Sequence, residues 1–318
     1  MCSAETQRAT PRILCAGIIV LDEVFRVEEF PKADGKVQAT GFFVVNGGCA
    51  ANAAVAVARL GGRAALAGPM GGPAGEDGNG DRVLKALARE QIDCSACQRV
   101  DGLATALSAI FIDAGGDRTI VTYRDEKIAA TLPRDAEAIV AAADAVLADN
   151  RYPDFVAPIC QAARRRGLPV VIDADRPTVE HDPLFRIASH VIFSSECLRE
   201  TTGIADLGEG LKRIAGETDA FLAVSNGPGD IVYLEAGALR RLPVFKIAAV
   251  DTLGAGDAFH GGFALALAEG QNEVAAMRFG AATAGIKCSR HGGSAGSPTR
   301  PEVEAFLAEQ VRAADGLI

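Results

Sequence analysis

The chain has 318 residues, of which 49% are hydrophobic and 23% charged, a composition typical of a folded globular protein and not of a disordered one. Its 32 basic and 41 acidic residues leave a net charge of −9, which excludes a general nucleic-acid binder because such a protein needs a basic face. The 59 alanines and 35 glycines, with no tryptophan, predict a core of small side chains with close backbone packing. No apolar run approaches the 18 residues or so of a membrane span, so no membrane association is expected.

Short apolar runs alternate with helical stretches along most of the chain. We expect strands at 12–20, 64–68, 145–148, 170–173, 190–193 and 221–224, and helices that include 50–60, 81–91, 158–166 and 207–216. Alternation of this kind predicts a parallel sheet covered by helices on both faces. The fold class is therefore α/β.

Two segments, at about 22–45 and 104–128, break this alternation because they are rich in β-forming residues and have no helix between their runs. The second contains Asp113-Ala-Gly-Gly-Asp117, a turn signal that predicts a hairpin. We expect these segments to form a small discontinuous β lid on a single domain spanning 1–318. An open lid sheet leaves a face unpaired, which predicts a homodimer formed through the lid.

The eight cysteines are mostly isolated, and only Cys94-Ser-Ala-Cys97 has the spacing of a redox or metal site. No second ligand pair accompanies it and the four histidines are scattered, which favours ordinary reduced thiols. The first 30 residues do not resemble a signal peptide. Both observations predict a cytoplasmic protein.

The stretch from Val250 to Phe259 carries the strongest chemical signal. Gly254, Ala255 and Gly256 come immediately before a helical pattern, so several backbone N–H groups are expected to point outward and form an anion hole for a phosphate. Asp257 falls in the first turn of that helix, where a carboxylate can accept a hydroxyl proton. The alternative is a plain glycine-rich turn with an aspartate cap.

A second signal lies at 46–54, where Gly47 and Gly48 precede an alanine-rich helix that contains Asn52. An amide in so apolar a run favours contact with a polyhydroxy ligand. The alternative is close packing of a helix on a sheet, for which alanine and glycine suffice.

The two motifs, in this order and about 200 residues apart, resemble the signatures of the ribokinase family, also called the PfkB family of carbohydrate kinases. The resemblance covers essentially the whole chain and implies a ribokinase-like fold with ATP as cofactor. Neither a P-loop nor a Rossmann fingerprint is present. Within the family, stretches at 54–60, 146–151, 257–261 and 286–293 look most like bacterial sulfofructose kinases.

The resemblance implies a role for each matching position. Asp257 corresponds to the catalytic base and Gly254, Ala255 and Gly256 to the anion hole. The sugar hydroxyls would be held by Asp22, Gly48 and Asn52. The nucleotide would be bound by Ser225, Gly227, Ala282, Lys287 and Gly292.

Two metal ions follow from the same resemblance. Phosphoryl transfer needs Mg²⁺, but the family's Asn-x-x-Glu element is replaced here by residues 194–197, so Glu196 and Glu200 are substitutes out of register and no ligand is assigned. Asp173 and Asp175, at the end of a strand, could face nucleotide or metal. Asp251 matches a residue associated with a monovalent cation, K⁺, beside the anion hole.

The substrate implied is a ketose-type sugar phosphorylated on a primary hydroxyl, with an anionic sugar such as sulfofructose or a fructose phosphate included. Lys36 and Arg151 match the positions expected to hold an anionic head, and Arg124 could join them, whereas Thr122 stands where an amide donor is expected. The simpler interpretation is that Lys36 and Arg151 are exposed cations in loops with no role in binding. Two other functions stay open: a nucleoside or other small-molecule kinase of the same family, and a catalytically silent sugar sensor.

Overall fold

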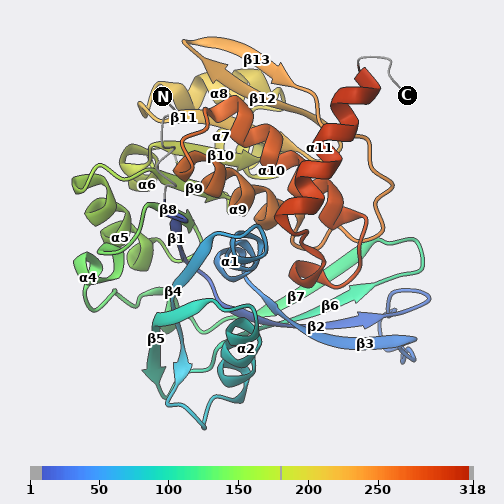
Figure 1. Cartoon of the computed structure of the whole chain (residues 1–318). Coiled ribbons are helices and arrows are strands. Elements are labelled where there is room, and N and C mark those ends of the chain that lie inside the picture. The colour runs from blue at the N-terminus through green and yellow to red at the C-terminus, as the bar shows by residue number, and fades with distance from the viewer. Residues whose placement is uncertain (1–8, 180, 315–318) are drawn as a thin grey trace, which may run out of the picture.

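A large twisted sheet with helices on both faces forms the body of the protein, and a smaller sheet extends from it (Figure 1). The computed structural model describes residues 9–179 and 181–314. The large sheet has the order β13-β12-β11-β10-β9-β8-β1-β4-β5. Its strands are β1 (Arg12–Ala16), β4 (Arg63–Gly72), β5 (Asp93–Asp101), β8 (Ala145–Asp149), β9 (Val170–Ala174), β10 (His190–Ser194), β11 (Phe221–Asn226), β12 (Gly229–Glu235) and β13 (Ala238–Leu242).

The strands from β11 to β5 pair in parallel, and β12 and β13 add an antiparallel edge. Alternate residues of β1 belong to opposite faces: Ile13 and Cys15 pack into one hydrophobic cluster, and Leu14 and Ala16 into the other. Because both faces of the sheet are covered by helices, every residue of such a strand is buried and its sequence is a continuous apolar run.

Helices cover both faces. One face is covered by α1 (Cys49–Arg59), α2 (Gly78–Arg89), α9 (Ala255–Ala268), α10 (Glu273–Cys288) and α11 (Arg300–Ala314). The other is covered by α3 (Glu126–Ala129), α4 (Ala136–Val140), α5 (Pro153–Arg165), α6 (Pro183–Ile187), α7 (Ser195–Thr202) and α8 (Leu207–Ala215). A short 3₁₀ turn, η1 (Gly293–Gly296), precedes α11. In the described ranges 9–179 and 181–314, no helix has the length and apolar character that crossing a membrane requires.

The packing of α9 depends on glycine. Gly261 lies so close to α1 that an added Cβ would be 2.7 Å from the carbonyl oxygen of Ala53, and Gly262 would meet Thr283 of α10 at 3.0 Å. The abundance of glycine and alanine in these helices therefore lets α1, α9 and α10 approach one another closely. This close packing fixes the start of α9 beside the start of α1.

The smaller sheet, called here the lid sheet, has the order β3-β2-β6-β7. Its strands are β2 (Val20–Arg26), β3 (Gly41–Gly47), β6 (Ala106–Ile112) and β7 (Arg118–Tyr123). The β2–β6 pair is parallel and the outer pairs are antiparallel. The small β-sheet lid predicted beside the large sheet is confirmed. Its strands lie within residues 20–47 and 106–123, and residues 126–129 form α3 on the large sheet.

One predicted strand is divided. The run 12–20 forms β1 up to Ala16 and then turns into the lid at Val20. Gly17 at the break has φ +149°, and a side chain there would overlap the carboxylate of Asp149. The apolar run continues through the break because Ile18 and Ile19 are also buried.

Candidate active site

The loop before α9 has the backbone geometry expected of an anion hole. Gly254 caps the helix with φ 78°, the left-handed conformation that glycine adopts without strain. The N–H of Ala255 is used locally, since it donates to the carbonyl of Thr252 at 3.2 Å. Among the described residues, the N–H groups of Gly256 and Asp257 donate to no backbone carbonyl, which leaves them free to bind an anion at the positive end of the helix dipole. Of the residues predicted for the hole, Gly256 has a free amide, whereas the amide of Ala255 is used within the loop.

Asp257 lies in the first turn of α9, as the motif predicted. Burial raises the pKa of this carboxyl to about 7, and the neighbouring charge of Asp173 adds to the effect, while a hydrogen bond from Asn52 opposes it. A carboxyl with a pKa near neutrality suits a general base that must accept a proton and release it. The electrostatics fit the role predicted for Asp257.

Asn52 connects the two sequence motifs, because its Nδ2 donates to Oδ2 of Asp257 at 2.8 Å across 205 residues of chain. The side chain is buried, with 6% exposure. Its Oδ1 is buried with no hydrogen-bond partner in the part of the chain that the structure describes. An unpaired buried acceptor carries a free-energy cost, which a hydrogen-bond donor on a bound ligand would relieve.

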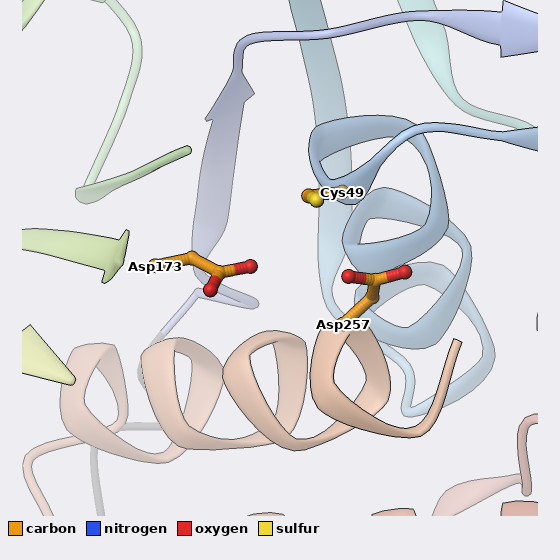
Figure 2. A group of neighbouring side chains, drawn as sticks. All are labelled: Cys49, Asp173 and Asp257. Carbon is orange, nitrogen blue, oxygen red and sulfur yellow. The ribbon is translucent and has the colours of Figure 1, made fainter. Parts of the chain in front are cut away.

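Figure 2 shows Cys49 of α1, Asp173 of β9 and Asp257 of α9 around one space. One ligand atom from each lies within 4.8 Å of the others. Asp173 is almost fully buried, and its pKa is raised well above the ordinary value, first by burial and then by the charges of Asp175 and Asp149. Burial likewise raises the pKa of the Cys49 thiol, which stays protonated and is no ligand for a hard cation.

Asp149, at the carboxyl end of β8, ties three segments together. Its carboxylate accepts the N–H groups of Ile18 at 2.8 Å, Ala50 at 3.2 Å and Arg151 at 3.0 Å. Burial raises its pKa to about 6 against the opposing effect of these bonds. The carboxylate thereby fixes the start of α1, and with it Gly48 and Asn52, at the carboxyl edge of the sheet, where ligands bind in open α/β folds.

Arg151, predicted to hold an anionic head, is already paired. Its guanidinium forms an ion pair and hydrogen bond with Asp175. Lys36 lies exposed in the loop between β2 and β3, and its ammonium group has no ion pair with any residue in 9–179 or 181–314. Arg124 stacks its guanidinium over the ring of Tyr152 at 5.7 Å. The structure records no contact among these three cations.

The inner face of the lid sheet contains Asp22, whose pKa burial raises to about 6 against a hydrogen bond from Ser108. Asp22 and Ser108 are register partners on β2 and β6, and Ser108 shares a hydrogen bond with Thr122 of β7 at 3.1 Å. This face is turned toward the large sheet, because Arg118 on it donates to Thr252 at 2.6 Å. Ser108 was not predicted from the sequence, although the alternation of β6 places it on the same face as Asp22.

Two predicted nucleotide contacts differ from expectation. Ala282 and Lys287 have no exposed surface, since Ala282 packs into the hydrophobic core and Lys287 is directed at Asp251. Neither side chain has accessible surface that an adenine ring could contact in this structure. Gly227, with φ 54°, lies in the turn after β11, and Ser225 donates to the Phe193 carbonyl at 3.3 Å, so this loop stays available for a phosphate. Gly292 donates its N–H to Asp251 at 3.0 Å.

The stretch that replaces the family's metal element begins α7. Ser194 is its cap, with Oγ accepting the N–H of Cys197 at 3.1 Å, and Glu196 and Glu200 are exposed on the helix. The residues gathered near Asp257 are Asp173 and Cys49 instead. Sequence spacing could not show this, since Asp173 and Asp257 are brought together only by the strand order.

A carboxylate beside free helix-terminal amides, at the carboxyl edge of a parallel sheet and next to a lid sheet, is the arrangement expected of an enzyme that transfers phosphoryl groups to a hydroxyl. Residues 10–300 match the model of the pfkB family of carbohydrate kinases. The chain belongs to this family, and it is an ATP-dependent carbohydrate kinase.

Several relatives extend over nearly the full length. The chain is 32% identical to the ATP-dependent ribose-1-phosphate kinase of Halopiger xanaduensis, covering 94% of this chain and 99% of that protein, and 28% identical to the ribokinase of Bacillus subtilis, covering 93% and 99%. A solved structure from Agrobacterium tumefaciens, provisionally called a ribokinase, superposes with a TM-score of 0.89 at 35% identity, covering 96% of this chain and 99% of that one. A fructokinase from Xylella fastidiosa with bound ATP gives a TM-score of 0.75 at 25% identity, covering 94% and 99%. The ribokinase-like fold is thereby confirmed.

Proposed function

We propose that the enzyme phosphorylates a primary hydroxyl of a ketose-type sugar held between the lid sheet and the start of α1. The observation that carries this proposal is the Asn52–Asp257 pair, in which one amide atom orients the base and the other, an unpaired buried oxygen, is left for a sugar hydroxyl. Asp22 and the backbone at Gly48 supply further polar groups for the same ligand. A primary hydroxyl suits this arrangement because its exocyclic carbon lets it reach the base while the ring stays bound.

In the proposed reaction, Asp257 takes the proton of the sugar hydroxyl. The hydroxyl oxygen bonds to the γ-phosphorus of ATP, and the bond between the γ-phosphorus and the oxygen bridging it to the β-phosphate breaks. The free N–H groups of Gly256 and Asp257 stabilise the charge on the moving phosphoryl group. ADP leaves, and the proton on Asp257 passes to solvent. The nucleotide's phosphates would meet the loop at Ser225 and Gly227.

Magnesium fits the donor set near the base. Mg²⁺ prefers oxygen ligands and keeps several waters, and Asp173 provides a buried carboxylate close to Asp257. We propose that Asp173 holds the ion directly or through water, in place of the exposed Glu196 and Glu200. When bound with ATP, the ion neutralises charge on the β- and γ-phosphates.

The surroundings favour a neutral sugar over an anionic one. The carboxyls of Asp22, Asp149 and Asp257 all have raised pKa values, which indicates that the site already disfavours negative charge, and Arg151 is neutralised by Asp175. An anionic sugar of the sulfofructose or fructose-phosphate type is the second candidate, because Lys36 has no ion pair within the described part of the chain and Arg151 could exchange its partner.

A coupled assay of ATP consumption over ribose, fructose, fructose 6-phosphate, tagatose 6-phosphate and 6-deoxy-6-sulfofructose tests the proposal. We expect the highest kcat/KM with a neutral sugar, and Lys36→Gln to change it by less than about twofold, the scale of a surface charge. A preference for an anionic sugar that Lys36→Gln and Arg151→Gln both weaken would establish the second candidate. Turnover of nucleosides but of no sugar would reject both.

We also propose a single domain that dimerises through the outer face of the lid sheet. By register, Phe42, Phe25 and Phe111 form a row on this face, with ring centroids 4.9 and 5.5 Å apart, and Phe42 and Val121 are 56% and 61% exposed. Exposed apolar surface of this kind suits a second copy of the chain. Light scattering should give the mass of a dimer for the native chain and of a monomer for Val121→Glu, and a native monomer would reject the proposal.

A cytoplasmic location is proposed from the use of ATP and from the free thiols at Cys15, Cys160 and Cys197.

A further inference from the structure

The family resemblance assigns a monovalent cation to the neighbourhood of Asp251, but the structure places a side chain there. Lys287, in the last turn of α10, has its Nζ 2.8 Å from the carbonyl oxygen of Asp251 and 3.4 Å from Oδ1 of the same residue. The lysine side chain has no exposed surface. Burial lowers the pKa of this amine, while the adjacent Asp251 carboxylate favours its charged ammonium form. The group is held directly behind the loop that shapes the proposed anion hole.

The carboxylate of Asp251 is fully engaged. Oδ1 accepts the N–H of Leu253 at 2.8 Å, and Oδ2 accepts those of Gly292 at 3.0 Å and Gly293 at 3.2 Å. Burial alone would raise the pKa of Asp251, yet these amides and the charge of Lys287 together hold it below its ordinary value. Asp251 is therefore a carboxylate whose counter-charge the chain itself provides.

These residues do not fit a bound potassium ion. An ion on Asp251 would need the carbonyl oxygen and the Oδ1 that the ammonium group already contacts, and it would lie beside a fixed positive charge. An ammonium group and K⁺ both satisfy backbone carbonyls and a carboxylate with a single positive charge, so one can take the place of the other.

We propose that the ammonium group of Lys287 is a built-in replacement for the monovalent cation, and that this kinase consequently needs no K⁺. The inference rests on the phosphoryl-transfer role proposed for the anion hole. Lys287 is a positioning residue: it holds Asp251, the loop passes through Leu253 to the left-handed Gly254, and the free amides of α9 follow. Its effect should fall on kcat more than on the KM for sugar.

The first test uses the native enzyme with its best sugar in K⁺, Na⁺ or choline chloride at equal ionic strength. We expect kcat to be the same within twofold in all three salts. A stimulation of fivefold or more by K⁺ over choline would overturn the proposal, without any need for a variant.

The second test uses Lys287→Ala and Lys287→Met, with the exposed lysine variant Lys85→Ala as control. Removing the side chain leaves room for an ion, so Lys287→Ala should lose at least tenfold in kcat in choline and regain most of it in K⁺. Lys287→Met fills the space without charge, and K⁺ should not restore it. Full activity of Lys287→Ala in choline would overturn the proposal.

Thermal melting gives a readout that does not depend on turnover. K⁺ should raise the Tm of Lys287→Ala but not that of the native chain or of Lys85→Ala, since only the first has an empty cation position. If Lys287→Ala does not fold, the salt dependence of native turnover still decides. A failure to find any sugar substrate would count against the proposed function and leave the melting result intact.

Discussion

Replacing Asp173 by asparagine should change the pH dependence of the kinase, because after burial its charge contributes most to the raised pKa of the proposed base. Burial and Asp173, in that order, raise the pKa of Asp257 to about 7. Asp257 must be ionised to accept a proton, so native kcat/KM should rise with pH and level off above pH 7. Asp173→Asn removes a negative charge and should move the rising, acid limb of the kcat/KM profile to lower pH.

The size of the change follows from the geometry. The ligand atoms of the two carboxyls lie within 4.8 Å of one another. At that distance and an effective dielectric constant of about 20, two unit charges interact by about 3.5 kcal/mol, or about 2.5 pH units. The pKa of Asp173 is itself raised, so the two carboxyls titrate together and share the effect, and we expect a smaller displacement of about one pH unit.

The assay is kcat/KM for Mg-ATP between pH 5 and 9, which reports the ionisation of the enzyme before nucleotide and metal bind. With the limb moved from about pH 7 to about pH 6, the variant should keep about half of its own plateau at pH 6, against about a tenth for the native enzyme. Its plateau should fall if Asp173 holds Mg²⁺, but the position of the limb is read relative to that plateau.

Asp219→Asn is the control, since Asp219 is exposed in the loop before β11, at the opposite end of the strand from the site. It should leave the limb unchanged. A limb for Asp173→Asn that stays at the native pH, or that moves upward, would refute the argument that Asp173 sets the ionisation of the base.

The remaining predictions concern the base and the anion hole. Asp257→Asn should lower kcat by about 10²- to 10⁴-fold while calorimetry shows sugar and ATP binding close to native; turnover near the native level would remove Asp257 from the role of base. Gly256→Ala should keep the native Tm, since an added Cβ meets nothing within 4 Å, yet lower kcat because the methyl group enters the anion hole. Gly254→Ala should instead lower Tm, by about 2 °C, because its φ of 78° costs an alanine about 1 kcal/mol. Equal melting temperatures for the two alanine variants would contradict this distinction.

Much of the site could be predicted from the sequence because it depends on local chemistry. A glycine pair before an alanine-rich helix, and a Gly-Ala-Gly before Asp257, each define a helix start with outward amides wherever they occur. That both starts meet, through Asn52 and Asp257, follows from the close packing of α1 on α9. The sequence motifs show the parts, whereas only the packing shows the distance between them.

The features that the sequence could not show depend on non-local pairing. The strand β5 was not predicted because Asp93-Cys-Ser-Ala-Cys-Gln-Arg-Val-Asp101 lacks the apolar alternation of a half-buried strand, and it lies at the sheet edge. The meeting of Asp173 with Asp257 requires the strand order. The pairing of Arg151 with Asp175, which neutralises a predicted anion-binding cation, depends on side-chain geometry at the ends of β8 and β9.

The lid sheet, which is built from residues 20–47 and 106–123, has a consequence for how such an enzyme can diversify. In the proposed site, Asp22 and Ser108 face the sugar from these two segments, while the proposed base and anion hole come from residues 254–257 of α9 and the loop before it. Mutations in the lid segments can therefore accumulate without touching the groups that carry out phosphoryl transfer. Selection could retune the choice of sugar through two short exchangeable segments, and a chimera that carries the lid segments of a relative is the corresponding route for engineering a new specificity.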